Sequence, residues 1–249
     1  MDTVKRVFEI LEYILKTPDG VLASEIAREF NMSISNAYKY LSTLESLGIL
    51  IKRKDKRYTG GFKLVEYGSI ILRSVDLRQV AHPYLIKLLM DTGQTVHMVV
   101  KDGFEGVYVE KLESASSLPM ISRVGMRAPL YCTAFGKSIL SHMPADELER
   151  YFRNVKLERR TEHTVTDPEL LKRELEKVRK NGYAVDNEEN ELGVKCIGAP
   201  ILNHEGYPVA AISISGVARK LDERMEEYAR LVKSCAEKIS ETLGYKRRR

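Results

Sequence analysis

Apolar residues in the first quarter of the chain recur at the three- and four-residue spacing of amphipathic helices. This spacing predicts helices over residues 3–16, 23–30 and 34–47. Ser33 is placed to cap the third helix by accepting a backbone N–H, and Gly48 suits the left-handed conformation that follows a helix end. The short break between the second and third helices predicts a helix-turn-helix, with the first helix packed behind it.

The predicted third helix has two unlike faces on a helical wheel. Its apolar face consists of Ile34, Ala37, Leu41, Leu44 and Gly48. Its opposite face and flanks carry hydrogen-bonding side chains, namely Ser35, Asn36, Tyr38, Lys39, Ser42, Thr43 and Ser46. No carboxylate precedes Glu45, as expected of a helix that offers donors and acceptors to the major groove of DNA. On this helix alone, an ordinary amphipathic helix with a polar outer face is an equally good interpretation.

A basic ribbon is predicted directly after the helix-turn-helix. Residues 49–51 form a short apolar strand, and Tyr58 can begin a return strand. Asp55 and Lys56 can turn the chain between them. The cations of such a wing would neutralise phosphates rather than read bases. A charge cluster is usually a solvated surface, but the position of this one after two helices favours phosphate contact.

Two sets of side chains are predicted to contact DNA. Base contacts are assigned to the third helix, at Ser35, Asn36, Lys39 and Thr43, with Ser33 and Tyr38 beside them. Phosphate contacts are assigned to the ribbon, at Lys52, Arg53, Lys54, Lys56 and Arg57. Together these sets predict a winged helix-turn-helix DNA-binding domain at residues 1–60.

The rest of the chain mixes helical and strand-like patterns. Residues 61–76 are predicted to be a linker helix, whose apolar side chains would pack on a partner chain or on their own neighbours. A helix over residues 77–92, with Pro83 as an alternative start, precedes strands over 95–101, 106–112, 118–124, 183–186, 196–202 and 208–215. Further helices are predicted over 134–142, 145–152, 168–180 and 222–243. Residues 77–249 are therefore expected to form an α+β domain with an antiparallel sheet.

Composition narrows the class of protein. The 249 residues are 43% hydrophobic and 30% charged, which is typical of a soluble globular protein, and no apolar run approaches a membrane span. An apolar signal segment is missing, and three irregularly spaced cysteines are too few for a disulfide framework or a zinc knuckle. A cytoplasmic protein is therefore predicted. The net charge of +5 permits nucleic-acid binding, but only the local clusters argue for it.

Two segments of the second domain suggest a ligand pocket. Along the strand at residues 208–215, Ser213 and Ser215 share a face of small side chains whose hydroxyls can bond an oxygen-rich ligand. The predicted helix that starts at Ala134, Phe135 and Gly136 has a positive dipole end that favours an anion such as a carboxylate. The plainer alternatives are serines bonded to their neighbours or to water, and an ordinary capped helix.

Several segments resemble the IclR family of bacterial and archaeal transcriptional regulators. Besides the winged helix-turn-helix, they are residues 124–137 (VGMRAPLYCTAFGK), 182–196 (GYAVDNEENELGVKC) and 210–216 (AAISISG). Each is weak alone, but their order and spacing are specific and span essentially the whole chain. The resemblance implies a GAF-like effector domain, control of DNA binding by a small molecule, and dimers that often pair into tetramers. It also implies a pocket lined by Met120, Ala134, Asp186, Val194, Cys196, Ser213 and Ser215.

The expected function is that of a repressor of metabolic genes. A homodimer or tetramer would bind a pseudo-palindromic operator in double-stranded DNA, and a small carboxylate-bearing effector would modulate this binding. An enzyme is one alternative, with Cys196 as nucleophile, Asp186 as orienting group and His97 as base. The same three side chains could instead hold a divalent metal in the pocket, although no short ligand spacing is present, and no cofactor is expected otherwise. A DNA-binding scaffold without a ligand is the third alternative.

Overall fold

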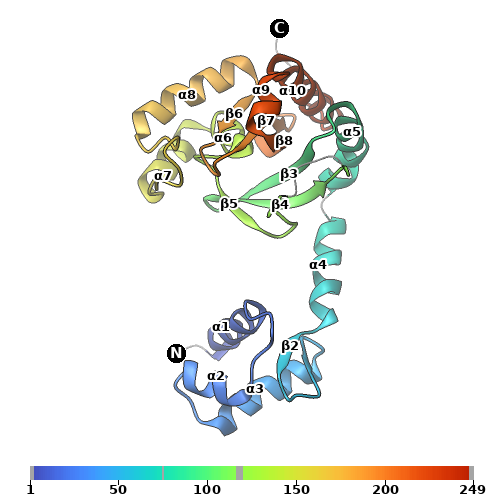
Figure 1. Ribbon diagram of the computed structural model, residues 1–249, viewed down its shortest axis with the longest axis vertical. Coiled ribbons are helices and arrows are strands. Elements are labelled where there is room, and N and C mark those ends of the chain that lie inside the picture. Colours follow the sequence, from blue (N-terminus) through green and yellow to red (C-terminus); the bar gives the residue numbers. More distant parts are fainter. Residues whose placement is uncertain (1–2, 75, 116–119, 247–249) are drawn as a thin grey trace. The chain divides into compact units, whose positions relative to one another are not determined.

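The computed structural model describes residues 3–74, 76–115 and 120–246 of the chain. They form two compact units, Met1–Val75 and Asp76–Arg249, and each unit has its own buried core (Figure 1). No helix in these described ranges combines the length and the apolar character that crossing a membrane would require. The combination of a helical first unit with a sheet-based second unit confirms the predicted fold class.

The first unit holds three helices, a two-stranded ribbon and a fourth helix. In chain order these are α1 (Thr3–Leu15), α2 (Ala23–Glu29), α3 (Ile34–Ser46), β1 (Leu50–Lys52), β2 (Tyr58–Gly60) and α4 (Phe62–Ser74). Their core includes Ile10, Ile14, Ile26, Leu41 and Tyr58, all of them almost fully buried. The predicted helix-turn-helix, with the first helix packed against it, is therefore confirmed.

Local sequence signals set both ends of α3. Ser33 Oγ accepts a hydrogen bond from the backbone N–H of Asn36 at 3.2 Å, as expected of an N-cap. Gly48 has a φ of 71°, the left-handed conformation that glycine adopts easily after a helix. Ile34, which the helical wheel places on the apolar face, has a side chain that remains 54% exposed. It is the first helical residue and lies ahead of Ala37, the first position of α3 that faces the core.

The ribbon follows α3 as predicted. Strands β1 and β2 pair antiparallel, and Tyr58 also bridges to Val21, which ties the ribbon to the segment before α2. The turn is closed by a hydrogen bond of 2.8 Å from the backbone N–H of Arg53 to the carbonyl oxygen of Arg57. Lys56 adopts the left-handed region within this turn, at a φ of 64°. The ribbon is thus paired at its strands and anchored at its base.

The second unit is built on one six-stranded antiparallel sheet. Its strands in chain order are β3 (Thr95–Asp102), β4 (Glu105–Leu112), β5 (Arg127–Pro129), β6 (Ala184–Asn187), β7 (Val194–Leu202) and β8 (Pro208–Val217). Their order in space is β5-β4-β3-β8-β7-β6, so the long strands β3 and β8 lie at the centre. This pairing places His97 opposite Ser213, although the two residues are far apart in the chain.

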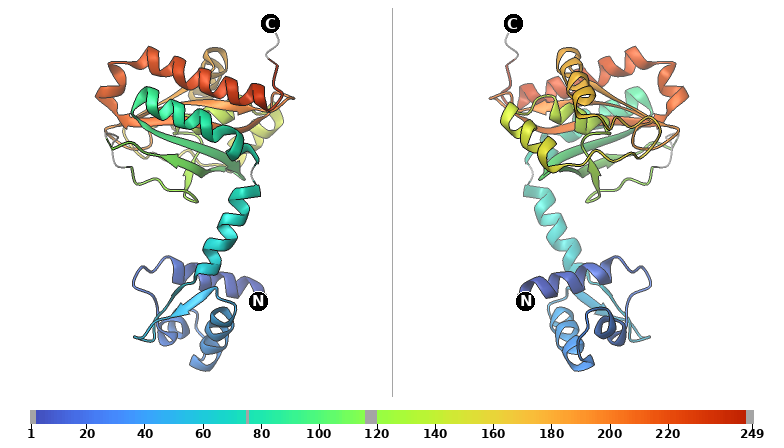
Figure 2. Two further views of the ribbon diagram at one scale, coloured as in Figure 1. Left: turned by 90° about the vertical axis from the view of Figure 1, so that its right-hand side faces the viewer. Right: turned by 90° about the vertical axis from the view of Figure 1, so that its left-hand side faces the viewer.

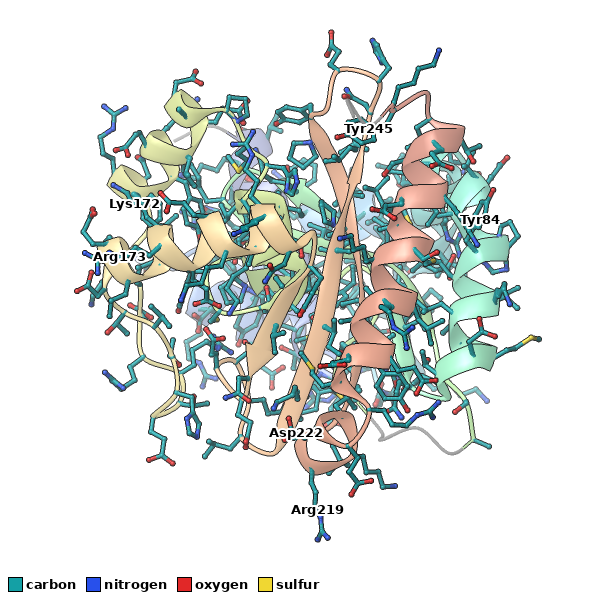
Figure 3. All side chains as sticks on the ribbon, turned by 90° about the horizontal axis from the view of Figure 1, so that it is seen from above. Tyr84, Lys172, Arg173, Arg219, Asp222 and Tyr245 are labelled. Carbon is teal, nitrogen blue, oxygen red and sulfur yellow. The ribbon has the colours of Figure 1, made fainter. Side chains whose placement is uncertain are left out.

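Helices cover both faces of this sheet. They are α5 (Asp76–Thr92), α6 (Ala134–Leu140), α7 (Ala145–Asn154), α8 (Pro168–Asn181), α9 (Ala218–Asp222) and α10 (Met225–Thr242). Helices α5 and α10 run side by side against one face, whereas α6 packs on the other face with α8 outside it (Figures 2 and 3). Because both faces are covered, β7 and β8 are buried along almost their whole length.

The strand predicted over residues 118–124 is wrong where it can be compared with the structure. Residues 116–119 lie outside the described residues, and residues 120–124 form no strand. Instead, the ammonium group of Lys111 holds the carbonyl oxygens of Met120 and Ser122 at 2.9 and 2.7 Å. Gly125 then turns the chain at a φ of 85°, and the short strand β5 follows. Side-chain hydrogen bonds therefore replace the expected strand pairing.

Two helix predictions also change. Helix α5 begins at Asp76, so Pro83 lies inside it and does not start it. The helix predicted over residues 222–243 corresponds to α10, which begins at Met225. The short helix α9 was not predicted, and a break over residues 223–224 separates it from α10. Arg224 lies in this break with a ψ of 27°, which is not helical, and its guanidinium binds Glu227 in the first turn of α10. Strand β5 was not predicted either, and the remaining helices and strands of the unit lie where the sequence predicts them, with small shifts at their ends.

Candidate DNA-binding surface and ligand pocket

The outer face of α3 gathers the side chains that were assigned to base contacts. Ser35, Asn36, Tyr38, Lys39 and Thr43 are all exposed, and the first turn of the helix contains no acidic residue. The hydroxyl of Thr43 donates to the carbonyl oxygen of Lys39 at 2.8 Å, so its hydrogen is already used within the helix. The face therefore offers amide, ammonium and phenol groups, together with hydroxyl oxygens that remain free to accept.

The ribbon beside α3 carries a tip of exposed cations. Lys54 and Lys56 are exposed, and neither forms an ion pair with another described residue. The Lys52 ammonium lies 5.5 Å from the ring centre of Tyr58 and 6.0 Å from that of Tyr38, within the range of cation–π attraction. Lys52 therefore links the ribbon to α3, and the two lysines at the tip remain available to a polyanion.

Arg57 has a structural role that the sequence did not suggest. Its Nη1 atom donates to the carbonyl oxygen of Gly20 at 2.8 Å and to Glu25 Oε2 at 3.2 Å. The same Glu25 oxygen accepts the backbone N–H of Leu22 at 2.8 Å and so caps α2. Arg53 is also engaged, at 3.4 Å from Asp55. Two of the five predicted phosphate-binding cations thus form ion pairs with acidic side chains of the protein.

The second unit contains a cavity enclosed by β3, β4, α6, β6, β7 and β8. It is lined by the predicted residues Met120, Ala134, Phe135, Asp186, Val194, Cys196, Ser213 and Ser215. It is also lined by His97, Tyr108, Thr133, Asn190 and Glu191, which were not assigned to it from the sequence. The empty space is about 370 Å³ with its mouth included, but only about 30 Å³ admits the centre of a water molecule. The lining side chains therefore lie close together.

Gly136 is the one predicted pocket residue outside this lining. A Cβ atom built on it would lie 2.2 Å from the carbonyl oxygen of Leu130, so the glycine allows close packing of α6 on that segment. Gly198 on β7 has a similar role, because a Cβ atom there would lie 2.8 Å from the backbone nitrogen of Phe135. The start of α6 is thereby held directly against the sheet.

A chain of hydrogen bonds crosses the floor of the pocket. Cys196 Sγ lies 3.0 Å from Ser215 Oγ, and Ser215 Oγ lies 3.4 Å from His97 Nδ1. His97 Nε2 lies 2.8 Å from the hydroxyl of Ser122. Burial, aided by the charge of Lys111, lowers the pKa of His97 to about 3, so its imidazole is neutral at physiological pH.

The same geometry opposes nucleophilic catalysis by Cys196. Burial, together with the nearby Asp186 carboxyl, raises the pKa of the Cys196 thiol far above its usual range. Ser215 separates the thiol from His97, so the imidazole does not accept a proton from it directly. A neutral thiol without a base in contact is a weak nucleophile.

A cluster of buried carboxylates with one lysine extends from Asp186 in the pocket lining. Burial, with the charge of Glu189 nearby, raises the pKa of Asp186 to about 7, although Asp186 Oδ1 accepts the backbone N–H of Glu189 at 2.8 Å. Lys137 is fully buried and pairs with Glu189 and, at 2.5 Å, with Glu174. Burial alone would lower the pKa of Lys137, but the two carboxylates outweigh it and raise the pKa. In the sequence, the one sign of this role of Lys137 is its position within a short helix whose other residues are mostly apolar or small.

The residues of the proposed metal site share the cavity but do not form a metal-binding group. Within the described ranges, no cluster of three or more His, Cys, Asp or Glu side chains has the geometry to hold a metal ion. His97 and Cys196 are joined through Ser215 rather than converging on one point. The donor set therefore fits hydrogen bonding to an organic ligand better than coordination of a cation.

A winged helix-turn-helix unit joined to a sheet domain with an internal cavity defines a class of DNA-binding transcriptional regulators. Residues 3–53 match the family model of the IclR helix-turn-helix domain, and residues 70–241 match that of the bacterial transcriptional regulator IclR C-terminal region. The chain therefore belongs to the IclR family, as its sequence resemblance implied. Its relatives are transcriptional regulators, so the enzyme alternative is not supported.

Relatives and solved structures match the chain over nearly its whole length. The HTH-type transcriptional regulator KdgR of Escherichia coli is 35% identical over 247 residues, which cover 98% of this chain and 94% of KdgR. The crystal structure of the Thermotoga maritima IclR is 56% identical, with a TM-score of 0.85 and coverage of 98% and 99%. An IclR homolog from Microbacterium hydrocarbonoxydans, solved in complex with 4-hydroxybenzoate, is 26% identical, with a TM-score of 0.83 and coverage of 97% and 99%.

Proposed function

We propose that this regulator is a cytoplasmic repressor of metabolic genes whose operator binding is modulated by a small carboxylate-bearing metabolite. Residues 1–60 bind double-stranded DNA, residues 61–76 form the linker helix, and residues 77–249 bind the effector. A homodimer, or a tetramer made from two dimers, places two copies of α3 in successive major grooves of a pseudo-palindromic operator. In this arrangement the regulator blocks transcription when its site overlaps a promoter.

The observation that carries the DNA-binding part is the acid-free outer face of α3 beside the lysine tip of the ribbon. Asn36 and Lys39 are suited to reading base edges, because their side chains offer donors and acceptors at the start of the helix. Lys54 and Lys56 are suited to phosphates, because their charges are exposed and unpaired among the described residues. One surface thus offers both kinds of contact that a specific DNA complex needs.

The linker helix supports self-association. On α4, Phe62 is 81% exposed, Val65 is 67% exposed and Ile70 is 56% exposed. Apolar side chains at these positions gain stability when a second helix covers them. We propose that this face of α4 packs against α4 of the partner subunit in the dimer. The distance between the two α3 helices then depends on how the two linker helices pair.

The effector part is supported by the pocket and by one relative. The Microbacterium homolog was solved with 4-hydroxybenzoate, which is a carboxylate. In this chain, Ser213 and Ser215 provide hydroxyls, and the raised pKa of Asp186 leaves that group protonated in a sizeable fraction of molecules at neutral pH. A protonated Asp186 can donate to a ligand carboxylate, whereas an ionised one would repel it.

The DNA-binding proposal is tested with the purified full chain and fragments of its own genome. We expect selective capture of one or a few upstream fragments, with an affinity that falls steeply as the salt concentration rises. Fragments that bind are then placed before a reporter gene, and repression by the wild-type protein supports the assigned sign of regulation. If no fragment shows salt-sensitive binding, the DNA-binding part is refuted.

The effector site is tested separately by thermal shifts against a panel of small carboxylates that includes 4-hydroxybenzoate. A ligand present at one hundred times its Kd stabilises the folded state by about 2.7 kcal/mol. Ser215→Phe fills the pocket, so we expect it to abolish this shift while operator binding remains. A Ser215→Phe variant that still responds to the same carboxylate would remove this strand face from the site.

A further inference from the structure

The hydrogen-bond chain at the pocket floor connects Ser215 on the central sheet to Ser122 in the segment before β5. At one end, Ser215 lines the cavity. At the other end, Ser122 belongs to the segment of residues 120–126, in which Met120 lines the cavity and Ile121 is 70% exposed. His97 lies between them, on the central strand β3, and is only 2% exposed. Its two ring nitrogens are the link.

Because His97 is neutral, its ring carries one N–H and one acceptor nitrogen. If the proton is on Nε2, His97 donates to Ser122 Oγ, and Nδ1 accepts the hydroxyl hydrogen of Ser215. If the proton is on Nδ1, His97 donates to Ser215 Oγ, and Ser122 donates to Nε2. Each order satisfies both nitrogens at the observed distances of 2.8 and 3.4 Å. The two arrangements therefore differ in the direction of both hydrogen bonds that the His97 ring makes.

A ligand in the pocket can select between these two arrangements. When a ligand oxygen accepts the hydroxyl hydrogen of Ser215, that hydrogen is no longer available to His97 Nδ1. The ring proton then belongs on Nδ1, and Ser122 must become the donor to Nε2. A ligand that donates to Ser215 favours the opposite order. Whether the ligand group at Ser215 donates or accepts a hydrogen bond thus determines, through the tautomer of His97, whether Ser122 donates or accepts.

The groups around His97 keep it in this role. The ring of Tyr108 packs against it at a centroid distance of 5.1 Å, and Ser213 lies across the strand pair. The charge of Lys111 opposes protonation of the ring, and the Lys111 ammonium also binds the backbone carbonyl oxygens of Met120 and Ser122. The ring therefore stays neutral and close to a segment whose backbone is already held in place.

We propose that His97 is a positioning residue that couples the ligand-facing hydroxyl of Ser215 to the conformation of residues 120–126. Its importance for regulation rests on the proposed effector site, but the coupling itself is a property of the folded protein without ligand. Residues 121–126, which do not line the cavity, thereby respond to the hydrogen-bond state of Ser215.

The coupling is tested by a double-mutant cycle read out by hydrogen exchange in the full chain. Amide exchange of peptides that cover residues 120–126 is measured in wild type, Ser215→Ala, His97→Phe and the double variant. We expect Ser215→Ala to change exchange in this segment by about threefold or more in the wild-type background, and by much less in the His97→Phe background. Ser213→Ala is the matched control, because it removes a hydroxyl on the same strand face that has no hydrogen bond to His97 among the described contacts.

Two outcomes would overturn the coupling: equal effects of Ser215→Ala in both backgrounds, or equal effects of Ser213→Ala and Ser215→Ala. If His97→Phe does not fold, His97→Gln and His97→Asn replace it, because their amides reach towards the Nε2 and Nδ1 positions respectively. Neither amide spans both hydroxyls, so each should weaken the coupling.

A second readout follows the ring itself. Nitrogen-15 NMR of histidine-labelled protein, with His97 assigned from a variant, reports which ring nitrogen carries the proton. We expect a neutral ring between pH 5 and pH 8, and Ser215→Ala should shift the proton to Nε2, because a protonated Nδ1 would lose its acceptor. A ring that protonates near pH 6.5, or one unaffected by Ser215→Ala, would contradict the coupling. No ligand or DNA is added, so this failure would be distinct from failure of the effector proposal.

Discussion

The surface of α3 with its ribbon and the pocket of the sheet domain are opposites in construction. The first comes from one continuous stretch of about 25 residues, is exposed and carries two lysines at its tip that form no ion pair with a described residue. The second draws its residues from six elements between His97 and Ser215, is buried and contains acids without a cation in its lining. The DNA backbone, a polyanion, binds to exposed cationic side chains that stay hydrated until binding. A small molecule in the pocket would bind to buried, desolvated groups whose protonation state is set by the surrounding protein.

The first test of this comparison between the two sites removes the buried cation Lys137 near the pocket. Lys137→Met leaves Glu189 and Glu174 without their partner inside the protein, so we expect the free energy of unfolding of the second unit to fall by about 3–5 kcal/mol. Denaturation by urea, followed by circular dichroism, measures the loss.

Two variants serve as controls for Lys137→Met. Lys172→Met removes a partly exposed lysine that pairs with Glu149 and Glu169, and we expect it to cost about 1 kcal/mol or less. Adding Glu189→Gln to Lys137→Met should restore part of the stability, because it removes one unpaired charge. Equal costs for the two lysines would show that the buried pair contributes nothing special.

The second test uses the proton on Asp186. Because burial raises the folded-state pKa of Asp186 to about 7, the folded protein keeps a proton that the unfolded chain releases near pH 4. The contribution of this carboxyl to stability is therefore fully present below about pH 4 and is lost as the pH rises towards 7. Asp186→Asn retains an oxygen that can accept the backbone N–H of Glu189 but does not ionise.

We expect Asp186→Asn to be more stable than wild type at pH 8, by about 2–4 kcal/mol, and to match it near pH 4. Urea denaturation of both proteins at a series of pH values measures this difference, in which the other titrating groups cancel. A difference that does not vary between pH 4 and pH 8 would show that Asp186 ionises normally in the folded state.

The third test sharpens the DNA side of the comparison. Asn36→Ala should weaken operator binding by about 1–3 kcal/mol and relax the preference at one base pair, because an amide that reads a base is lost. Fluorescence anisotropy with operator variants measures both effects. Ser46→Ala, near the end of the same helix, removes a hydroxyl that already donates to Thr43, and it should leave the preference unchanged. Weakening without any change in preference would reassign Asn36 to the backbone.

The smallest expected effect belongs to a single phosphate contact. Lys54→Ala should weaken binding to all DNA sites alike and reduce the slope of log affinity against log salt by about 0.9. Lys177→Ala, an exposed lysine on α8 in the other unit, is the matched control and should leave the slope unchanged. If Lys54→Ala altered which sequence is preferred, the assignment of the ribbon to phosphates would be wrong.

The DNA-binding side was the easier to predict, because its signals are local. The spacing of apolar residues, the Ser33 cap and Gly48 each act over a few residues, and the structure confirms the helices that they define. What the sequence could not show is that Arg57 reaches Glu25, since that contact depends on the bridge between Val21 and β2. In the sequence, a cation within a basic run cannot be assigned either to solvent or to an ion pair within the protein.

The pocket could not be assembled from local patterns. Ser213 and Ser215 were identified by strand alternation, but Asp186 and Cys196 entered only through the family resemblance. Tyr108, Asn190 and Glu191 were missed, since only pairing of distant strands brings them together. The strand expected over residues 118–124 failed for a related reason. Lys111, on the neighbouring strand β4, binds two of its carbonyl oxygens, and this contact could not be predicted from the segment itself.

The fastening of the ribbon has a consequence for how the protein meets DNA. Arg57 on Glu25 and Gly20, together with the bridge from Tyr58 to Val21, holds the ribbon in one shape before any nucleic acid arrives. Association then needs little ordering of this element, so the heat-capacity change on binding should lack a contribution from coupled folding. A rigid ribbon also cannot remould itself to suit different duplexes, and discrimination must come from α3 and from the deformability of the DNA itself.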